Sequence, residues 1–325
     1  MKLRSGPMLR KKVYGLWIFG GLSLAILPLF LDTGIIRILV FANLYAILAM
    51  SWDIFSGHTG YISFGHSFLA GTAAYTSSLL NYHLGLPLFV SMPLAIIATL
   101  VLGMLLFFPA LRLRGSYFTL ITLLLSVVAV QFVKIFSQYT GGDRGLTPIS
   151  TIASGAIANF YVTLAFMLII ALGLWYVSTS HLGFVLKAIA QAEDTVSDAG
   201  LDTTKFKFFA FLLSAFTAGI GGCLWVHYLG SVTPAVLSVD LSVFILIAAI
   251  IGGMGTIIGP ILGGYVMVFL LEYLRPYVPS SGRMLIFGIL GMMVLLYFSE
   301  GLGVKLRAQI QISSRWIKTR KKNYG

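Results

Sequence analysis

HLGFVLKAIAQAEDTVSDAGLDTTKFK, residues 181–207, is the longest polar interval between two strongly apolar segments of the chain, and it decides how the fold is organised. Its first half places apolar side chains on one helical face, at Leu182, Val185, Leu186, Ile189 and Ala190. Gly200 then ends the pattern, and Asp202 with the two threonines after it can cap a new helix. The stretch predicts an amphipathic helix, a glycine turn and a fresh helix start.

This polar stretch also concentrates acidic side chains. It holds four of the ten acidic residues of the chain, which are Glu193, Asp194, Asp198 and Asp202. A loop of this kind between two membrane segments is suited to bind a partner protein in the cytoplasm. A solvated connector is an equally good interpretation of the stretch taken alone.

The composition indicates a membrane protein. The 325 residues are 58% hydrophobic and only 10% charged, so a soluble fold could not hide the apolar surface. Continuous apolar runs of about 20 residues, the length that crosses a bilayer, recur along the chain. We therefore expect an all-α polytopic membrane protein.

About ten transmembrane helices are expected. The first run, after the basic start of the chain, is too long for a signal-peptide core and lacks a small-residue cleavage site, so it counts as a retained helix. The ten predicted spans are 13–31, 35–52, 62–81, 87–109, 117–136, 159–178, 207–229, 241–258, 260–275 and 284–299.

The basic residues predict the orientation. With the amino terminus inside, 17 of the 22 Lys and Arg fall on the cytoplasmic side and 5 on the other, as the positive-inside rule requires. Both termini are then cytoplasmic. The predicted organisation is a basic amino terminus (1–12), a transmembrane domain (13–300) with a cytoplasmic loop at 179–206, and a basic tail (301–325).

Two glycine-rich patches interrupt the apolar runs, one at 56–75 and one at 252–264. Irregular backbone at membrane depth survives only where protein or a water-filled cavity covers it, so the first patch should face the bundle interior. Close helix packing without any path is the alternative. The candidate path residues are Gly57, Gly60, Ser63, Gly65 and His66. The two patches lie in opposite halves of the chain, as in transporters with internal repeats.

No enzyme chemistry is visible. The chain has no GxxxxGK[ST] phosphate loop, HExxH or CxxC motif, its five histidines are scattered, and no catalytic triad is recognisable. We expect no catalytic, cofactor or metal site. The carboxylates of Asp32, Asp53, Asp240, Glu272 and Glu300 fall near span ends, which disfavours an ion-coupled transporter.

Five ordered segments resemble the permease subunits of branched-chain amino-acid ABC importers, LivM type. They are SGHTGYISFGH (56–66) with AAY (73–75), RLRGSYFTLITL (112–123), TGGDRGL (140–146), positions within 183–211, and GGMGTIIGP (252–260). Any single glycine motif would be weak, but the ordered set covers most of the chain.

The resemblance implies that the 179–206 loop is the coupling loop, which inserts into a groove on a separate ATPase subunit. The importer pattern E-A-A-x-x-x-G would place Asp194, Thr195 and Val196 before Gly200, so the alanine pair is replaced. Glu193 matches the acidic position of the branched-chain subfamily. The implied coupling residues are Lys187, Ala188, Glu193, Asp194, Asp198 and Gly200.

The resemblance further implies the partners and the location. These are ABC ATPase subunits that hold ATP and Mg, a second homologous permease chain, and an extracytoplasmic substrate-binding protein, at the bacterial inner membrane. Loop 137–150 could dock that protein or be an ordinary glycine-rich loop. The open alternatives are a permease for urea or short amides, an ion-coupled secondary transporter and a non-transporting scaffold.

Overall fold

The computed structural model describes residues 30–111 and 115–279, together with isolated positions (21, 24–26, 28, 113, 282–283, 285–286, 288–289 and 292–293). The described chain is helical. Its elements are α2 (Thr33–Trp52), η2 (Asp53–Gly57), α3 (His66–Leu84), α4 (Leu88–Ala110), α5 (Ser116–Ile135), α6 (Ser137–Thr140), η3 (Gly142–Arg144), α7 (Ala156–Ser178), α8 (His181–Asp198), α9 (Thr203–Leu229), η4 (Pro234–Leu237), α10 (Val239–Gly252) and α11 (Ile258–Leu274).

Five of these described segments are long and apolar enough to cross a membrane: Thr33–Gly57, which joins α2 to the π-helical η2, and the helices α4, α5, α7 and α9. Helices α10 and α11 are apolar but shorter. The eight predicted spans from 35–52 to 260–275 each coincide with a helix, which confirms an all-helical membrane fold. The spans 13–31 and 284–299 lie outside the described ranges, so the total of ten and the side of the termini stay predictions.

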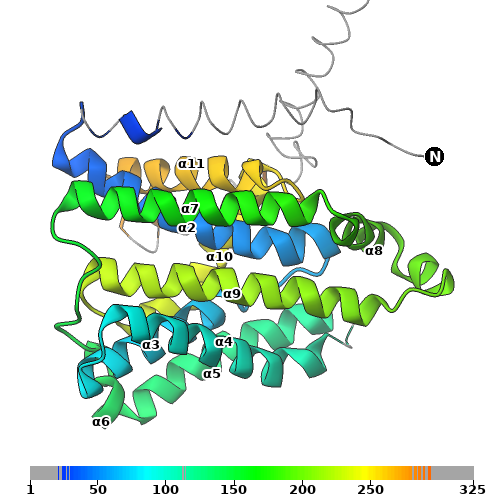
Figure 1. The fold of residues 1–325 in the computed structure, drawn as a ribbon, viewed down its shortest axis with the longest axis horizontal. Helices are drawn as coiled ribbons and strands as arrows, with labels where there is room; N and C mark the ends of the chain where they lie inside the picture. Colours follow the sequence, from blue (N-terminus) through cyan, green and yellow to red (C-terminus); the bar gives the residue numbers. More distant parts are fainter. Residues whose placement is uncertain are drawn as a thin grey trace, which may run out of the picture.

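The long helices run side by side between two ends of the molecule (Figure 1). Helix α8 lies at one end, called here the α8 end, and α6 lies at the other, called the α6 end. Helix α2 runs toward the α8 end and α9 runs away from it. The basic residues predicted to lie on opposite sides separate accordingly: Lys187 and Lys205 belong to the α8 end, and Lys134 and Arg144 to the α6 end.

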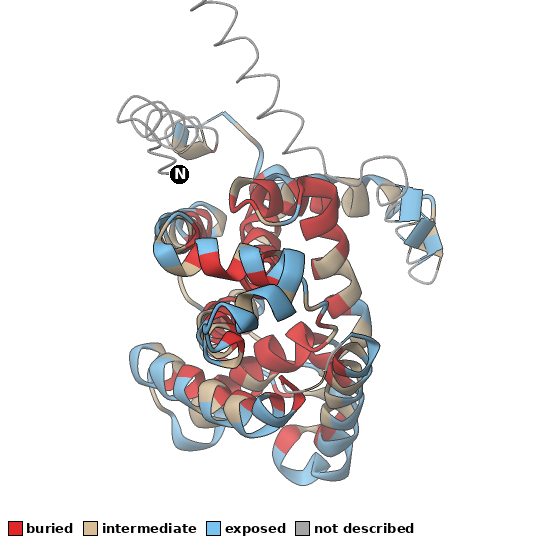
Figure 2. Ribbon diagram, turned by 90° about the vertical axis from the view of Figure 1, so that its right-hand side faces the viewer, coloured by how far each residue is buried: buried red, intermediate tan, exposed pale blue. Residues whose placement is uncertain are grey.

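Helix α2 forms the centre of the packing. It contacts α7, α9, α10 and α11, and an unbroken run of its residues from 42 to 52 is buried. A helix that is buried all round needs apolar or small side chains on every face, which the sequence of α2 supplies. Burial is concentrated in the middle of the bundle, while the outer faces are exposed (Figure 2).

Helices α4 and α5 expose large apolar side chains outward. Phe89, Leu105 and Leu120 are among them, at 90%, 67% and 57% exposure. Contiguous apolar surface of this kind is a liability in water and suits contact with lipid or another protein. The exposed faces therefore agree with the membrane assignment that the composition predicts.

Candidate functional site

Helix α8 is two helical segments joined at a break. Ala192 has φ −157° and ψ 82°, which is not helical and separates residues 181–191 from 193–198. The first segment packs on the bundle through Val185, Leu186 and Ile189, three of the five positions predicted for its apolar face. Ala190 is exposed instead. The short second segment projects at the α8 end, where Asp194 and Asp198 are exposed.

The turn after α8 follows local chemistry. Gly200 has φ +85°, a conformation that glycine adopts without the steric cost of a side chain, and its N–H donates to the Ser197 carbonyl at 2.9 Å. Asp202 caps α9 by accepting from the Lys205 N–H at 3.2 Å. That hydrogen bond and the nearby Lys205 ammonium lower the pKa of Asp202. The predicted glycine turn and helix cap are confirmed.

Glu193 points into the protein, not out of it. Its carboxylate accepts hydrogen bonds from Tyr61 Oη at 2.6 Å, Thr203 Oγ1 at 3.1 Å and Lys207 Nζ at 2.7 Å. Burial disfavours the charged carboxylate, but these donors outweigh it and lower the pKa of Glu193. Glu193 thus joins the break in α8 to α9 and to the segment before α3.

Lys207 completes this cluster from the first turns of α9. Its side chain is 3% exposed, lies over the Tyr61 ring with Nζ 4.4 Å from the ring centroid, and donates to the Leu111 carbonyl at 3.4 Å. A buried ammonium needs such partners because the cost of removing it from water is large. Tyr61, Glu193 and Lys207 are called the coupling cluster below.

A second polar chain runs inward from Lys187. Its Nζ donates to Ser178 Oγ at 3.4 Å, and Ser178 Oγ lies 2.7 Å from His58 Nε2. His58 Nδ1 lies 2.9 Å from the Asp53 carbonyl oxygen. The Asp53 carboxylate is buried and accepts from the Gly255 N–H at 2.6 Å. This series of polar contacts connects α8 to the turn between α10 and α11.

The two glycine-rich patches meet at this point. A Cβ added to Gly57 would overlap the Asp53 carboxylate and lie 2.9 Å from the Gly255 nitrogen. Glycine is therefore required at this contact between the two patches. The patches are 200 residues apart in sequence, and their contact was not part of the sequence prediction.

The predicted path residues lie on one segment, and four of the five pack inside the bundle. The Ser63 carbonyl accepts from Trp52 Nε1 at 2.8 Å, and His66 Nε2 lies 2.8 Å from Ser214 Oγ. A Cβ on Gly65 would lie 2.6 Å from the Phe107 ring. Gly60 is exposed, with φ +78°, beside Ala190 of α8. These contacts fill the space around the segment in this conformation, and its role as a path stays a prediction.

Cavities also lie elsewhere in the described part of the chain, including two between the helices. One, of about 660 Å³, is lined by Asp32, Arg37, Glu272 and Arg275 between α2 and α11. The other, of about 390 Å³, lies between α2, α9, η4 and α10. Sequence reasoning identified neither, because their walls come from segments distant in the chain.

Sequence reasoning also did not assign Tyr61, Lys207 or Asp53 to a site. Asp53 was expected near a span end, and it does lie at the end of α2, but in a fully buried position. A lysine five residues inside an apolar helix is the one signal that could have pointed to a buried partner, since an unpaired charge there is costly.

Comparison with known proteins identifies the family. Residues 34–297 match the model of the branched-chain amino acid transport system / permease component family. The high-affinity branched-chain amino acid transport system permease protein LivM of Salmonella typhimurium is 28% identical over 316 residues, covering 88% of this chain and 74% of LivM. The ribose import permease protein RbsC of Haemophilus influenzae is 24% identical, covering 74% of this chain and 76% of RbsC.

The fold has a solved relative. A chain described as an inward-facing conformation of a metal-chelate type ABC transporter superposes with a TM-score of 0.50 and 16% identity, over 87% of this chain and 99% of that one. The helical arrangement is thus that of an ABC transporter membrane subunit. With the family model covering most of the sequence, this multi-pass membrane chain belongs to the family of permease components of branched-chain amino acid transport systems.

Proposed function

We propose that this chain is the membrane-spanning permease subunit of an ATP-binding-cassette importer and forms part of the path for branched-chain or related amino acids. The family match and the LivM relatives support the cargo class. The chain itself carries no catalytic step, and ATP with Mg is bound by separate ATPase subunits. A second homologous permease chain and an extracytoplasmic binding protein complete the complex in the bacterial inner membrane.

The coupling cluster is the observation that carries this proposal. The segment 193–198, which exposes Asp194 and Asp198, begins at Glu193, whose carboxylate is held by Lys207 of α9 and Tyr61 of the glycine-rich segment. A push on the exposed segment would therefore reach both a spanning helix and the predicted path segment. Packed elements transmit such motion as rigid bodies. Residues 179–206 are the coupling loop in this account, and Asp194, Asp198 and Ala188 are its exposed contacts.

The test is ATP-dependent uptake of leucine by proteoliposomes that contain the purified complex. Uptake should require ATP and the binding protein, and it should persist when the ion gradient is collapsed. Uptake that follows the ion gradient without ATP would instead indicate a secondary transporter. Uptake of urea in place of leucine would support the alternative cargo.

Coupling is tested separately with Glu193→Lys, which places a second ammonium against Lys207. ATP hydrolysis by the complex should continue while leucine uptake falls. Glu272→Gln, on the α6 end, is the matched control and should leave both unchanged. Normal uptake in a properly inserted Glu193→Lys variant would contradict the coupling role.

A further inference from the structure

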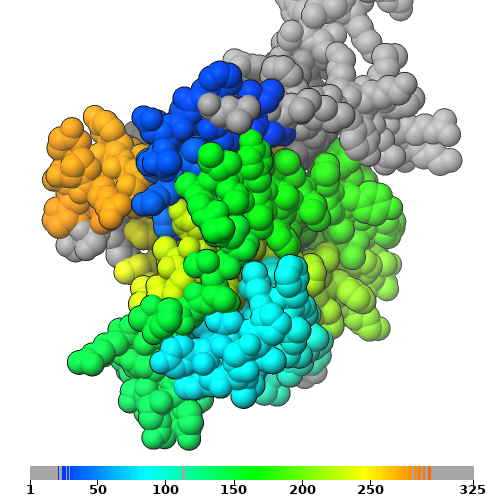
Figure 3. Space-filling model, turned by 60° about the vertical axis from the view of Figure 1, so that its left-hand side comes forward, coloured from blue at the N-terminus to red at the C-terminus, as the bar shows by residue number. Residues whose placement is uncertain are grey.

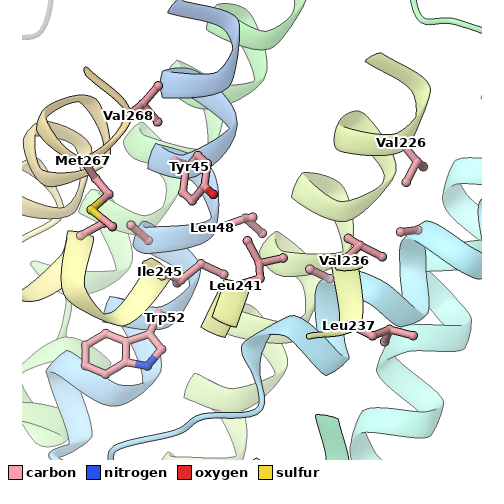
Figure 4. Close-up of a cluster of buried hydrophobic side chains, with 14 of the residues drawn as sticks. Tyr45, Leu48, Trp52, Val226, Val236, Leu237, Leu241, Ile245, Met267 and Val268 are labelled. Carbon is pink, nitrogen blue, oxygen red and sulfur yellow. The ribbon is translucent and has the colours of Figure 1, made fainter. Parts of the chain in front are cut away.

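The cavity of about 390 Å³ has an apolar floor and a partly polar rim. The floor consists of Tyr45, Val226, Val236 and Leu241, each less than 10% exposed. The rim includes Leu229, Thr233 and Asp240, which are exposed. Figure 4 shows Tyr45 on α2, Leu241 on α10 and Val236 on η4 within one cluster of buried hydrophobic side chains. The volume falls in the range of small-molecule sites.

The rim lies at the α6 end. Leu229 is the last residue of α9, which ends there, and the η4–α10 surface is visible between α11 and the loop that precedes α7 (Figure 3). The loop that precedes α7 holds the rim in place through backbone hydrogen bonds. Leu146 and Val232 exchange backbone hydrogen bonds of 3.0 and 3.1 Å, and the Ile149 N–H donates to the Gly230 carbonyl at 2.9 Å. The rim is therefore held by the residues that connect α5 to α7.

Asp240 provides the charge of the cavity. Among the lining residues that the structure describes, it is the only acidic one, and none is a lysine or arginine. It forms no ion pair with a basic group in the described part of the chain. By contrast, Asp143 and Glu272, two other carboxylates at the α6 end, pair with Lys134 at 2.9 Å and Arg275 at 3.3 Å. The cavity thus presents one negative charge suited to a cationic group.

The remaining walls suit an aliphatic side chain and a carboxylate. Trp225 packs edge-on against Tyr45, with ring centroids 5.2 Å apart, and Leu241 and Phe244 face the same cavity. Ser231 and Thr233 line it as well, and their hydroxyls make no hydrogen bond within the described residues. An apolar pocket with a few convergent polar groups is the usual form of a small-molecule site.

We propose that this cavity is the first binding station in the membrane for a zwitterionic amino acid with an aliphatic side chain. Asp240 binds the ammonium group, the wall of Trp225, Leu241 and Phe244 receives the side chain, and the hydroxyls of Ser231 and Thr233 receive the carboxylate. The inference rests on the proposed import function. It replaces none of the predicted path residues, which lie on the segment from the end of α2 to the start of α3, toward the α8 end.

The larger cavity between α2 and α11 fits this role less well. Its Glu272 and Arg275 already pair with one another across one turn of α11. Its charged rim also lacks an aromatic wall apart from Phe41. A ligand there would compete with an existing ion pair, whereas Asp240 has none to break among the described residues.

The chain offers a direct binding test because Cys223 is its single cysteine and is buried. In a Cys223→Ser background, Ala235→Cys places one thiol in the cavity wall, and Gln138→Cys places one on α6 outside it. Both are labelled with a thiol reagent in membranes that contain the whole transporter, with leucine, 4-methylpentanoate or glycine added. Leucine should slow labelling of Ala235→Cys and leave Gln138→Cys unaffected. 4-Methylpentanoate lacks the ammonium group and glycine lacks the side chain. Each should therefore slow labelling of Ala235→Cys less than leucine does.

Asp240→Asn then tests the ammonium contact. The leucine concentration that gives half protection should rise roughly fivefold to twentyfold, as expected for losing one charge-assisted contact at a partly exposed site. Glu272→Gln should not change it. The proposal would be overturned if leucine gave no protection, or if 4-methylpentanoate protected as well as leucine. It would also be overturned if Asp240→Asn left the leucine concentration for half protection unchanged.

This assay needs no ATP, so its failure is distinct from failure of the import function. ATP-dependent leucine uptake without protection of Ala235→Cys would overturn the station and leave the import function standing. Protection without any ATP-dependent uptake would support the station and contradict the import mechanism.

Discussion

Lys207 and Glu193 show how single residues hold the α8 end together. The Lys207 ammonium is 3% exposed and lies 2.7 Å from the Glu193 carboxylate, which is 16% exposed. Removing one member of a buried pair leaves the other charge without compensation, which costs more than the pair itself contributes. The pair therefore constrains both α8 and α9.

Glu193→Gln should destabilise the protein by about 2 kcal/mol, because the Lys207 ammonium stays buried with only neutral acceptors beside it and no carboxylate to balance its charge. The double variant Glu193→Gln with Lys207→Met should recover part of that loss, since neither charge then remains. Thermal unfolding in detergent measures both. A double variant less stable than the sum of the single changes would argue against a direct pair.

Acid should weaken the same contact. The pKa of Glu193 lies below its usual 4.5 in the folded protein, so its ion pair stabilises the fold fully above that value. The contribution is lost as the pH falls below about 4.5 and through the lower folded pKa. Unfolding temperatures measured from pH 7 to pH 3 should drop more steeply for the native chain than for Glu193→Gln. Parallel curves would contradict the assignment.

At the scale of elements, small residues decide how closely helices approach. Gly263 of α11 lies against α10, where an added Cβ would overlap the Ala248 carbonyl oxygen. Close backbone approach through glycine is a common mode of helix packing in membranes. Gly173 of α7 has no atom near its Cβ position. The two glycines therefore form a matched pair.

Gly263→Ala should destabilise the bundle by about 1–3 kcal/mol, the usual cost of forcing extra volume into a packed site. Gly173→Ala should be neutral or gain up to about 1 kcal/mol, because alanine is the better helix former. Thermal unfolding of the two variants side by side provides the comparison. Equal stability of the two would show that α10 and α11 do not pack as described.

The turn after α8 supports a separate prediction. Proline at position 200 cannot adopt φ +85° and would remove the N–H that bonds to Ser197. Gly200→Pro should therefore uncouple ATP hydrolysis from uptake while membrane insertion is retained. Gly200→Asn, which tolerates this backbone region better, should keep most of the coupling. Uptake and ATPase rates of the same preparations separate the two outcomes.

These elements differ in how far sequence predicts them. Gly200 and Asp202 act on their immediate neighbours, so their turn and cap could be read from the chain alone. The apolar runs likewise predicted α2 to α5, α7 and α9 to α11, with boundaries shifted by a few residues. The contacts of Lys207 with Tyr61 and of Gly57 with Gly255 join residues 146 and 198 positions apart. Such pairs depend on how helices pack, which local patterns do not encode.

At the scale of the whole molecule, the helix contacts repeat. Helix α3 packs on α4 and α9, and α10 packs on α11 and α2; α4 contacts α9 as α11 contacts α2. The two sets of helices therefore make the same contacts when α2 corresponds to α9, α3 to α10 and α4 to α11. Helices α2 and α9 run in opposite directions. This pattern agrees with the internal repeat that the two glycine patches suggest, in an inverted arrangement, and it brings the two patches into contact at Gly57 and Gly255.

The proposed mechanism requires that the α8 end face the cytoplasm, where ATP is available. Asp198→Cys and Gln138→Cys, each in the Cys223→Ser background, place one thiol on the exposed part of each end. A membrane-impermeant maleimide applied to intact cells with a permeable outer layer should label Gln138→Cys. It should reach Asp198→Cys only after the membrane is permeabilised, because a charged reagent cannot cross the hydrocarbon core. Labelling of Asp198→Cys from outside would place the coupling segment beyond reach of any ATPase and contradict the import mechanism.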